Sequence, residues 1–157
     1  MIKKIKPYVI SVAIALIVGG LSALITSGNM NIYDTINTPP LAPPGYLFGI
    51  VWPILYVLMG ISASLVYTAK GEPKTEVSSA LKTFALQLFV NFFWSIIFFN
   101  LRAFLFAFIW LVFLWILIFI MIVKFIKIRP VSGYLQIPYI LWVTFALYLN
   151  FMVYILN

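Results

Sequence analysis

Long apolar runs separated by short polar segments divide the chain into five similar parts. The runs cover residues 7–27, 45–69, 77–100, 104–127 and 134–157. A helix that crosses the hydrocarbon core of a bilayer needs about 20 mostly apolar residues, and each run meets that requirement. We therefore predict an all-α integral membrane protein, in which five transmembrane helices form a bundle and residues 1–157 make a single membrane domain.

The longest polar segment, residues 28–44, ends in the proline-rich stretch Pro39–Pro44, after which Gly45 opens the second apolar run. Inside that run Trp52 is followed by Pro53. Proline lacks a backbone donor, and its ring crowds the carbonyl four residues earlier. In a bilayer a freed carbonyl is tolerated only where protein, water or a ligand satisfies it. This stretch is therefore predicted to form the mouth and one wall of a ligand pocket.

The basic residues indicate the orientation in the membrane. Only Arg102 follows the third run, whereas the other nine lie in the N-terminal tail or around the segments after the second and fourth runs: Lys3, Lys4, Lys6, Lys70, Lys74, Lys82, Lys124, Lys127 and Arg129. By the positive-inside rule the N-terminus is cytoplasmic and the C-terminus lies outside. We expect a bacterial or archaeal cell membrane. Because the charges follow the membrane edges, the net charge of +7 does not indicate nucleic-acid binding.

Composition excludes several kinds of chemistry. Hydrophobic residues make up 65% of the chain and charged residues 8%, and there is neither cysteine nor histidine. The usual near-neutral acid–base group and commonest metal ligand is therefore missing. No charge lies deep in a run, since Lys82 and Lys124 are near enough to an edge to snorkel. We predict no catalytic residue, no metal site and no ion-coupled pump.

Three runs carry an aromatic face at helical spacing. These faces are Phe48, Trp52 and Tyr56 in the second run; Gln87, Asn91 and Trp94 in the third; and Tyr139, Trp142, Ala146 and Asn150 in the fifth. Convergence of the three would form an apolar cavity with a few amide and indole donors, suited to a flat, hydrophobic, heteroaromatic or carbonyl-bearing ligand. The alternative is a structural or scaffolding membrane protein without a ligand, whose amides only link neighbouring helices.

Three motifs extend this picture. They are Pro43–Tyr56, Gln87–Phe99 and Pro138–Asn150. In order, spacing and the number of apolar runs the chain resembles the TspO/MBR family, the tryptophan-rich sensory proteins and translocator proteins, or peripheral-type benzodiazepine receptors. The resemblance implies a five-helix bundle, commonly a homodimer, that binds porphyrin, haem and benzodiazepine-site ligands beneath the first long loop and requires no cofactor.

The resemblance also implies site residues. Trp52 and Asn91 match positions that contact the carbonyl of a ligand in the family. Eight further residues match pocket-lining positions: Tyr33, Pro44, Phe48, Tyr56, Gln87, Trp94, Trp142 and Ala146. The expected function is that of a membrane receptor or carrier for tetrapyrroles, acting in their transport, in sensing or in stress regulation.

The chain departs from the family pattern in two respects. Leu41 and Ile32 stand where many relatives carry tryptophan. Proposals of light-dependent protoporphyrin breakdown in the family depend on such tryptophans, so an enzyme of that kind is the alternative rather than the main expectation. No lysine or arginine follows Tyr148 or Tyr154, so the cholesterol-recognition pattern of animal members is missing and cholesterol is not an expected partner.

Overall fold

The computed structural model describes residues 1–157 and contains helices but no strand. Five helices are long and apolar enough to cross a membrane. The elements in chain order are α1 (Ile2–Thr26), the 3₁₀ helix η1 (Ser27–Asp34), α2 (Gly45–Tyr67), α3 (Lys74–Ser95), the π-helix η2 (Ile96–Asn100), α4 (Phe104–Ile128), α5 (Pro130–Tyr134) and α6 (Ile137–Leu156). The prediction of an all-α bundle of five membrane helices is confirmed.

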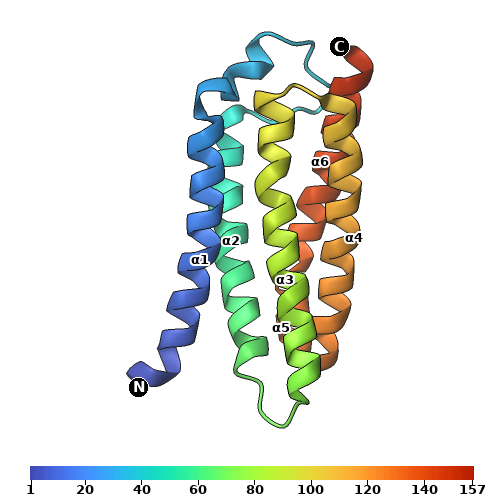
Figure 1. Cartoon of the computed structure of the whole chain (residues 1–157). Helices are drawn as coiled ribbons and strands as arrows, with labels where there is room; N and C mark the ends of the chain where they lie inside the picture. Colours follow the sequence, from blue (N-terminus) through green and yellow to red (C-terminus); the bar gives the residue numbers. More distant parts are fainter.

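The connecting segments gather at two opposite ends of the bundle (Figure 1). The N-terminus, the α2–α3 loop and the short helix α5 lie at one end, which we call the N-terminal end. The loop after η1, the α3–α4 turn and the C-terminus lie at the other, which we call the loop end. The assignment of the N-terminal end to the cytoplasm stays a prediction.

Element boundaries differ from the predicted runs at several points. Helix α1 begins at Ile2 and includes Pro7, and η1 (Ser27–Asp34) occupies the first part of the predicted outer loop. Helix α3 begins at Lys74, three residues before the predicted run, and Pro73 is its N-cap residue with a non-helical ψ of 132°. Hydropathy does not locate such ends, since the polar first turns of α1 and α3 extend these helices beyond their apolar cores.

Helix α4 supplies one side of the core. Its residues Leu111, Leu114, Ile118, Met121 and Phe125 are at most 1% exposed and recur every three or four positions. This spacing places them on one face of the helix, which packs against α3 and α6. The opposite face of α4 is exposed and apolar, as expected for a surface in contact with lipid.

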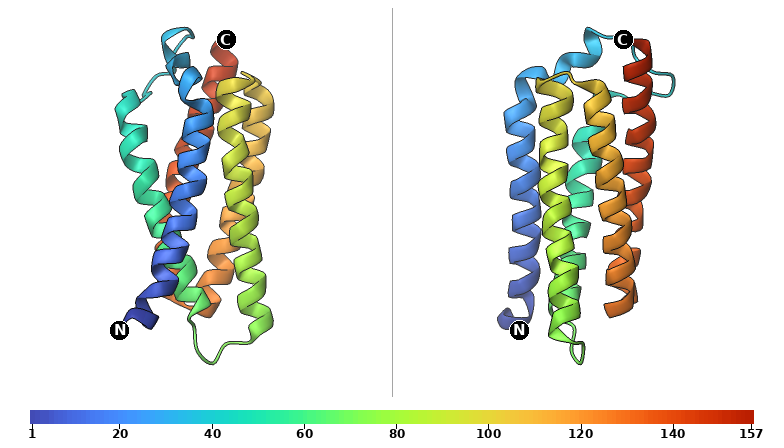
Figure 2. Two further views of the ribbon diagram at one scale, coloured as in Figure 1. Left: turned by 60° about the vertical axis from the view of Figure 1, so that its left-hand side comes forward. Right: turned by 45° about the vertical axis from the view of Figure 1, so that its right-hand side comes forward.

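Helices α1 and α2 pack closely in one half and separate in the other. A Cβ atom on Gly60 would lie 2.4 Å from the Cα atom of Val12, so the two backbones touch there. Further along, the ring of Tyr56 occupies the space beside Gly19. Towards the loop end α2 leans away from its neighbours (Figure 2, left). The divergence of this pair creates room inside the bundle.

Candidate ligand-binding cavity

A cavity of about 520 Å³ lies in the loop-end half of the bundle, where α1 and α2 diverge. Its lining comes from six elements: Leu16, Gly19, Gly20, Ser22, Ala23 and Thr26 of α1; Met30 and Tyr33 of η1; Gly45, Phe48, Gly49, Trp52, Pro53 and Tyr56 of α2; Trp94 and Ser95 of α3; Phe99 of η2; and Trp142 and Ala146 of α6. No charged side chain is among them. The cavity is therefore suited to an uncharged or weakly polar molecule.

Aromatic rings line several sides of the cavity. Phe48 stacks on Tyr33 with ring centres 6.2 Å apart and forms an edge-to-face pair with Trp142, with ring centres 5.6 Å apart. Trp52 stacks on Tyr56 at 5.7 Å. Rings in such offset and edge-on arrangements stabilise one another and present flat apolar faces. They can stack against a flat ligand without large rearrangement.

Polar groups of the lining differ in whether they are already paired. The indole nitrogen of Trp94 donates to Asn150 Oδ1 at 3.1 Å, and Ser22 Oγ donates to the carbonyl of Phe92 at 3.2 Å. The indole nitrogen of Trp142, by contrast, is buried and has no hydrogen-bond partner in the chain. Buried polar groups are nearly always paired, so this unpaired donor is unusual. Its nitrogen has almost no accessible surface, so a ligand in the cavity pairs with it only if the indole turns.

Four side chains form a continuous network behind Tyr56. The Tyr139 hydroxyl donates to Gln87 Oε1 at 2.7 Å and accepts from Asn91 Nδ2 at 2.6 Å. The Tyr56 hydroxyl contacts Asn91 Oδ1 at 3.4 Å. Both amides are almost fully buried and do not line the cavity. The network joins α2, α3 and α6 and holds the Tyr56 ring, which does line the cavity.

The C-terminus secures the segment that follows η1. Asn157 Oδ1 accepts from the backbone N–H of Asn37 at 2.8 Å, and Asn157 Nδ2 donates back to the Asn37 carbonyl at 3.1 Å. The Tyr148 hydroxyl donates to the carbonyl of Pro40 at 2.9 Å. These contacts connect the end of α6 to the segment between η1 and α2, which itself contributes no residue to the cavity lining.

Seven of the ten predicted ligand-binding residues come together around the cavity: Tyr33, Phe48, Trp52, Tyr56, Trp94, Trp142 and Ala146. Pro44 precedes the first residue of α2 and does not line it. Gln87 and Asn91 do not line the cavity either, because helix α3 is rotated so that both amides bond to the Tyr139 hydroxyl, with Tyr56 against Asn91. Their contact with a ligand therefore stays a prediction that requires Tyr56 to move.

The sequence reasoning did not identify two groups of lining residues. One is the small-residue face of α1, including Gly19, Gly20 and Ala23, which carries no aromatic or amide group to indicate a site. The other is Met30, in a segment expected to be loop. Small residues permit close packing and also leave space, so their presence in α1 could not distinguish the two roles.

Comparison with known proteins agrees with the fold and the motifs. The family model described as "TspO/MBR family" matches residues 11–156. The tryptophan-rich protein TspO of Chlorobaculum tepidum is 38% identical over 80% of this chain and 78% of its own length. The protein CrtK of Rhodobacter capsulatus is 39% identical over the same shares of the two chains. The translocator protein of Ovis aries is 29% identical over 76% of this chain and 70% of its own length.

Both the match along nearly the whole chain and the identity to these relatives point to one family. The three motifs that form the cavity walls fall within the matched residues. The chain is therefore an integral membrane protein that belongs to the TspO/MBR family.

Proposed function

We propose that this protein is a membrane receptor or carrier for a flat, hydrophobic, heteroaromatic ligand, and that this ligand is a tetrapyrrole such as a porphyrin. The cavity volume of about 520 Å³ falls in the range of about 300–1,000 Å³ that is typical of small-molecule sites. Its aromatic, uncharged lining suits the faces of a conjugated ring. The family membership supports the same class of function.

The aromatic, uncharged lining of the cavity is the observation that carries this proposal, and the unpaired indole nitrogen of Trp142 is a donor that we assign to the ligand. A buried donor without a partner destabilises the unliganded protein by about 1–3 kcal/mol. A carbonyl oxygen, a carboxylate oxygen or an unprotonated ring nitrogen of a ligand would pair it once the indole turns towards the cavity. The indole of Trp52, which stacks on Tyr56 at the cavity wall, is the second donor that we assign to the ligand.

We expect stacking and hydrogen bonds, rather than a strong axial ligand to iron, to bind the tetrapyrrole. The chain has no histidine or cysteine, the usual strong axial ligands of haem. The single thioether of the cavity lining belongs to Met30, which is 46% exposed. A metal-free porphyrin is therefore expected to bind at least as well as haem.

A porphyrin titration of two matched variants tests the proposal. Trp142→Phe keeps an aromatic ring in the cavity and removes the donor, so the Kd for protoporphyrin IX should rise about tenfold. Trp115→Phe is the control, because Trp115 lies on α4 outside the cavity and donates to Thr144 Oγ1. The Soret absorbance of the porphyrin reports binding. Equal affinity in the wild type and Trp142→Phe would contradict the role of the indole donor.

A light-dependent protoporphyrin-degrading enzyme is the second candidate. Three indoles, those of Trp52, Trp94 and Trp142, line the cavity and could donate electrons to an excited porphyrin. The triple replacement by phenylalanine should then abolish the protein-dependent products formed under illumination. If the products persist at the same rate, ordinary photobleaching accounts for them and the enzyme proposal fails.

Carrier and receptor functions differ in one measurable quantity. A carrier moves porphyrin across proteoliposomes faster than it crosses empty vesicles, whereas a receptor binds without increased flux. A protein with a purely structural role would bind no porphyrin, and its melting temperature would not rise on adding the ligand.

A further inference from the structure

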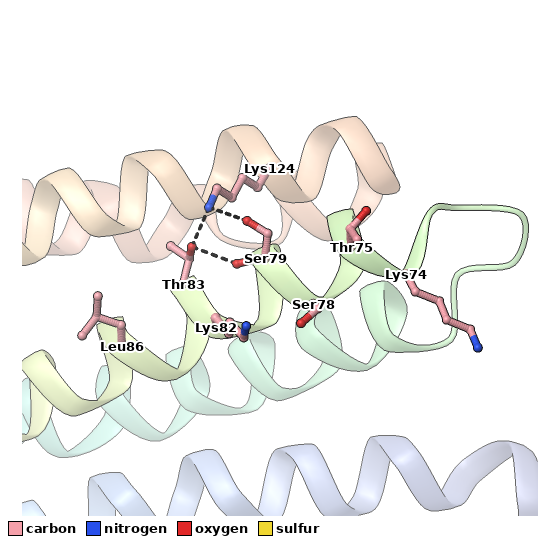
Figure 3. A pocket seen from close by; sticks show the side chains of 8 residues that line it. All are labelled: Lys74, Thr75, Ser78, Ser79, Lys82, Thr83, Leu86 and Lys124. Carbon is pink, nitrogen blue, oxygen red and sulfur yellow. Dashed lines mark hydrogen bonds between the residues drawn. The ribbon is translucent and has the colours of Figure 1, made fainter.

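A second hollow lies far from the cavity, along α3 and the end of α4 near the N-terminal end of the bundle. Its volume is about 530 Å³, and it shares no residue with the cavity. We call it the basic groove and define it by its lining: Lys74, Thr75, Ser78, Ser79, Lys82, Thr83, Leu86 and Lys124 (Figure 3). Seven of these eight side chains are polar, in a chain that is 65% hydrophobic.

The charge of the groove is entirely positive. Three lysines line it, and no aspartate or glutamate does. The only acidic residue of α3, Glu76, is exposed and is not part of the lining. The groove is therefore electrostatically complementary to an anion.

Lys124 of α4 is positioned by neutral partners. Its ammonium group donates to Ser79 Oγ at 2.9 Å and to Thr83 Oγ1 at 3.0 Å, across the interface with α3 (Figure 3). An ammonium group has three donors, so one remains for another acceptor. The sequence suggested that Lys124 would only snorkel to the membrane edge, whereas the structure has it partly buried and bonded between two helices.

The groove changes character with depth along the helices. Lys124 lies four residues, or about 6 Å, before the end of α4, so the charges are near the bundle end. Along α3 the stripe that begins at Lys82 continues to Leu86 and Phe89, which are 46% and 58% exposed. Charged and hydroxyl groups thus give way to exposed apolar groups in the inward direction. A phospholipid changes from headgroup to acyl chain in the same direction.

We propose that the basic groove binds an anionic phospholipid, with the headgroup phosphate at Lys82 and Lys124 and an acyl chain along Leu86 and Phe89. Basic hollows between membrane helices are suited to anionic headgroups, and hydrogen bonds from ammonium groups to phosphate are strong. The hydroxyl groups of Ser78 and Thr75 add donors at the start of α3. This site is independent of the aromatic cavity and of its ligand.

Native mass spectrometry of the full-length protein in a neutral detergent tests this proposal. The probes are dioctanoyl phosphatidylglycerol, dioctanoyl phosphatidylcholine and inorganic phosphate. The variants are Lys124→Gln and Lys82→Gln, and the control is Lys127→Gln, which removes the same charge from an exposed residue outside the groove. We expect phosphatidylglycerol to bind the wild type more tightly than phosphatidylcholine and each groove variant to weaken it about fivefold. Lys127→Gln should leave the affinity unchanged.

Three results would overturn the proposal. They are equal affinity for the two lipids, an equal loss in Lys127→Gln and the groove variants, and competition by inorganic phosphate at the same concentration as lipid, which would identify a free-phosphate site instead. Lys82 is exposed, so its replacement cannot act by unfolding the core, and it keeps the test valid if Lys124→Gln folds poorly. Unchanged protoporphyrin binding in both groove variants would verify that the cavity is intact.

Discussion

The two halves of the α1–α2 pair use glycine for opposite purposes. Near the N-terminal end Gly60 lets the backbone of Val12 approach so closely that no Cβ atom fits between them. Near the loop end Gly45 and Gly49 have no atom within 4 Å of the position where a Cβ atom would lie. Gly60 therefore lies at a close helix contact, whereas Gly45 and Gly49 border open space. Glycine in a membrane helix therefore does not by itself indicate packing.

The physical basis of this difference is the membrane environment. Lipid tails are as apolar as leucine, so helices associate through close packing and hydrogen bonds rather than through a hydrophobic driving force. The tight contact at Gly60 can hold α1 against α2, while the network around Tyr139 holds α2 near α3 and α6. With those attachments in place, the other half of α2 can lean outward and leave a cavity.

Replacing Gly60 by valine is expected to cause the largest loss of stability. The added side chain would clash with the Val12 backbone, which cannot move without shifting α1, and we expect a loss of about 3 kcal/mol of unfolding free energy. Gly49→Val is the matched control and should leave stability nearly unchanged, because its Cβ atom enters empty space. Denaturant titration in detergent micelles measures both. Similar losses of unfolding free energy at Gly60 and Gly49 would contradict the distinction between a close contact and open space.

Removing the Tyr139 hydroxyl should have the next largest effect. Tyr139→Phe leaves Gln87 Oε1 and Asn91 Nδ2 without this partner in the interior, which we expect to lower the unfolding free energy by about 2 kcal/mol. Tyr134→Phe serves as the control, since Tyr134 is 56% exposed. The same denaturant titration applies. If both variants are as stable as the wild type, the network does not hold the helices together.

Filling the cavity in the loop-end half of the bundle should change porphyrin binding more than stability. Gly49→Leu places an isobutyl group in the cavity, so the Kd for protoporphyrin IX should rise at least tenfold, or by about 1.4 kcal/mol. Gly28→Leu also introduces a side chain into open space but lies outside the cavity lining, so it should bind porphyrin normally. Absorbance titration distinguishes the two. Normal porphyrin binding by Gly49→Leu would place the ligand elsewhere.

Releasing the loop from the C-terminus is expected to have the smallest effect. Asn157→Ala removes the exposed hydrogen bonds between the Asn157 side chain and Asn37, so overall stability should fall by less than about 1 kcal/mol. Amide hydrogen exchange in residues 35–44 should nevertheless become faster, while exchange in α4 remains unchanged. Uniform acceleration in both segments would show that the contact supports the whole bundle instead.

Part of the site was predictable because it depends on short-range periodicity. Phe48, Trp52 and Tyr56 are four residues apart, so any helix over this stretch places them on one face, and all three line the cavity. The amides of Gln87 and Asn91 also share a face, as predicted. Their position behind Tyr56 could not be predicted, because it depends on how α3 is rotated against α2 and α6.

The irregular elements next to the cavity were also beyond sequence reasoning. The residues Ile96–Asn100 form a π-helix, although their apolar pattern continues that of α3 without interruption. Met30 and Tyr33 lie in a 3₁₀ helix within a segment that its turn residues marked as loop. Such elements have weak local preferences and are stabilised by what packs against them.

The sequence by itself determined the membrane character of the protein, its five spanning helices and its family. Each of these follows from run length, hydropathy or motif order, which are properties of residues close together in the chain. Only the tertiary structure decided that Gly60 lies at a helix contact whereas Gly49 borders open space. It also decided that the Asn91 amide is paired with Tyr139 and that the Trp142 indole nitrogen has no partner. These outcomes depend on the tilt and rotation of whole helices, which are set by packing between residues far apart in sequence.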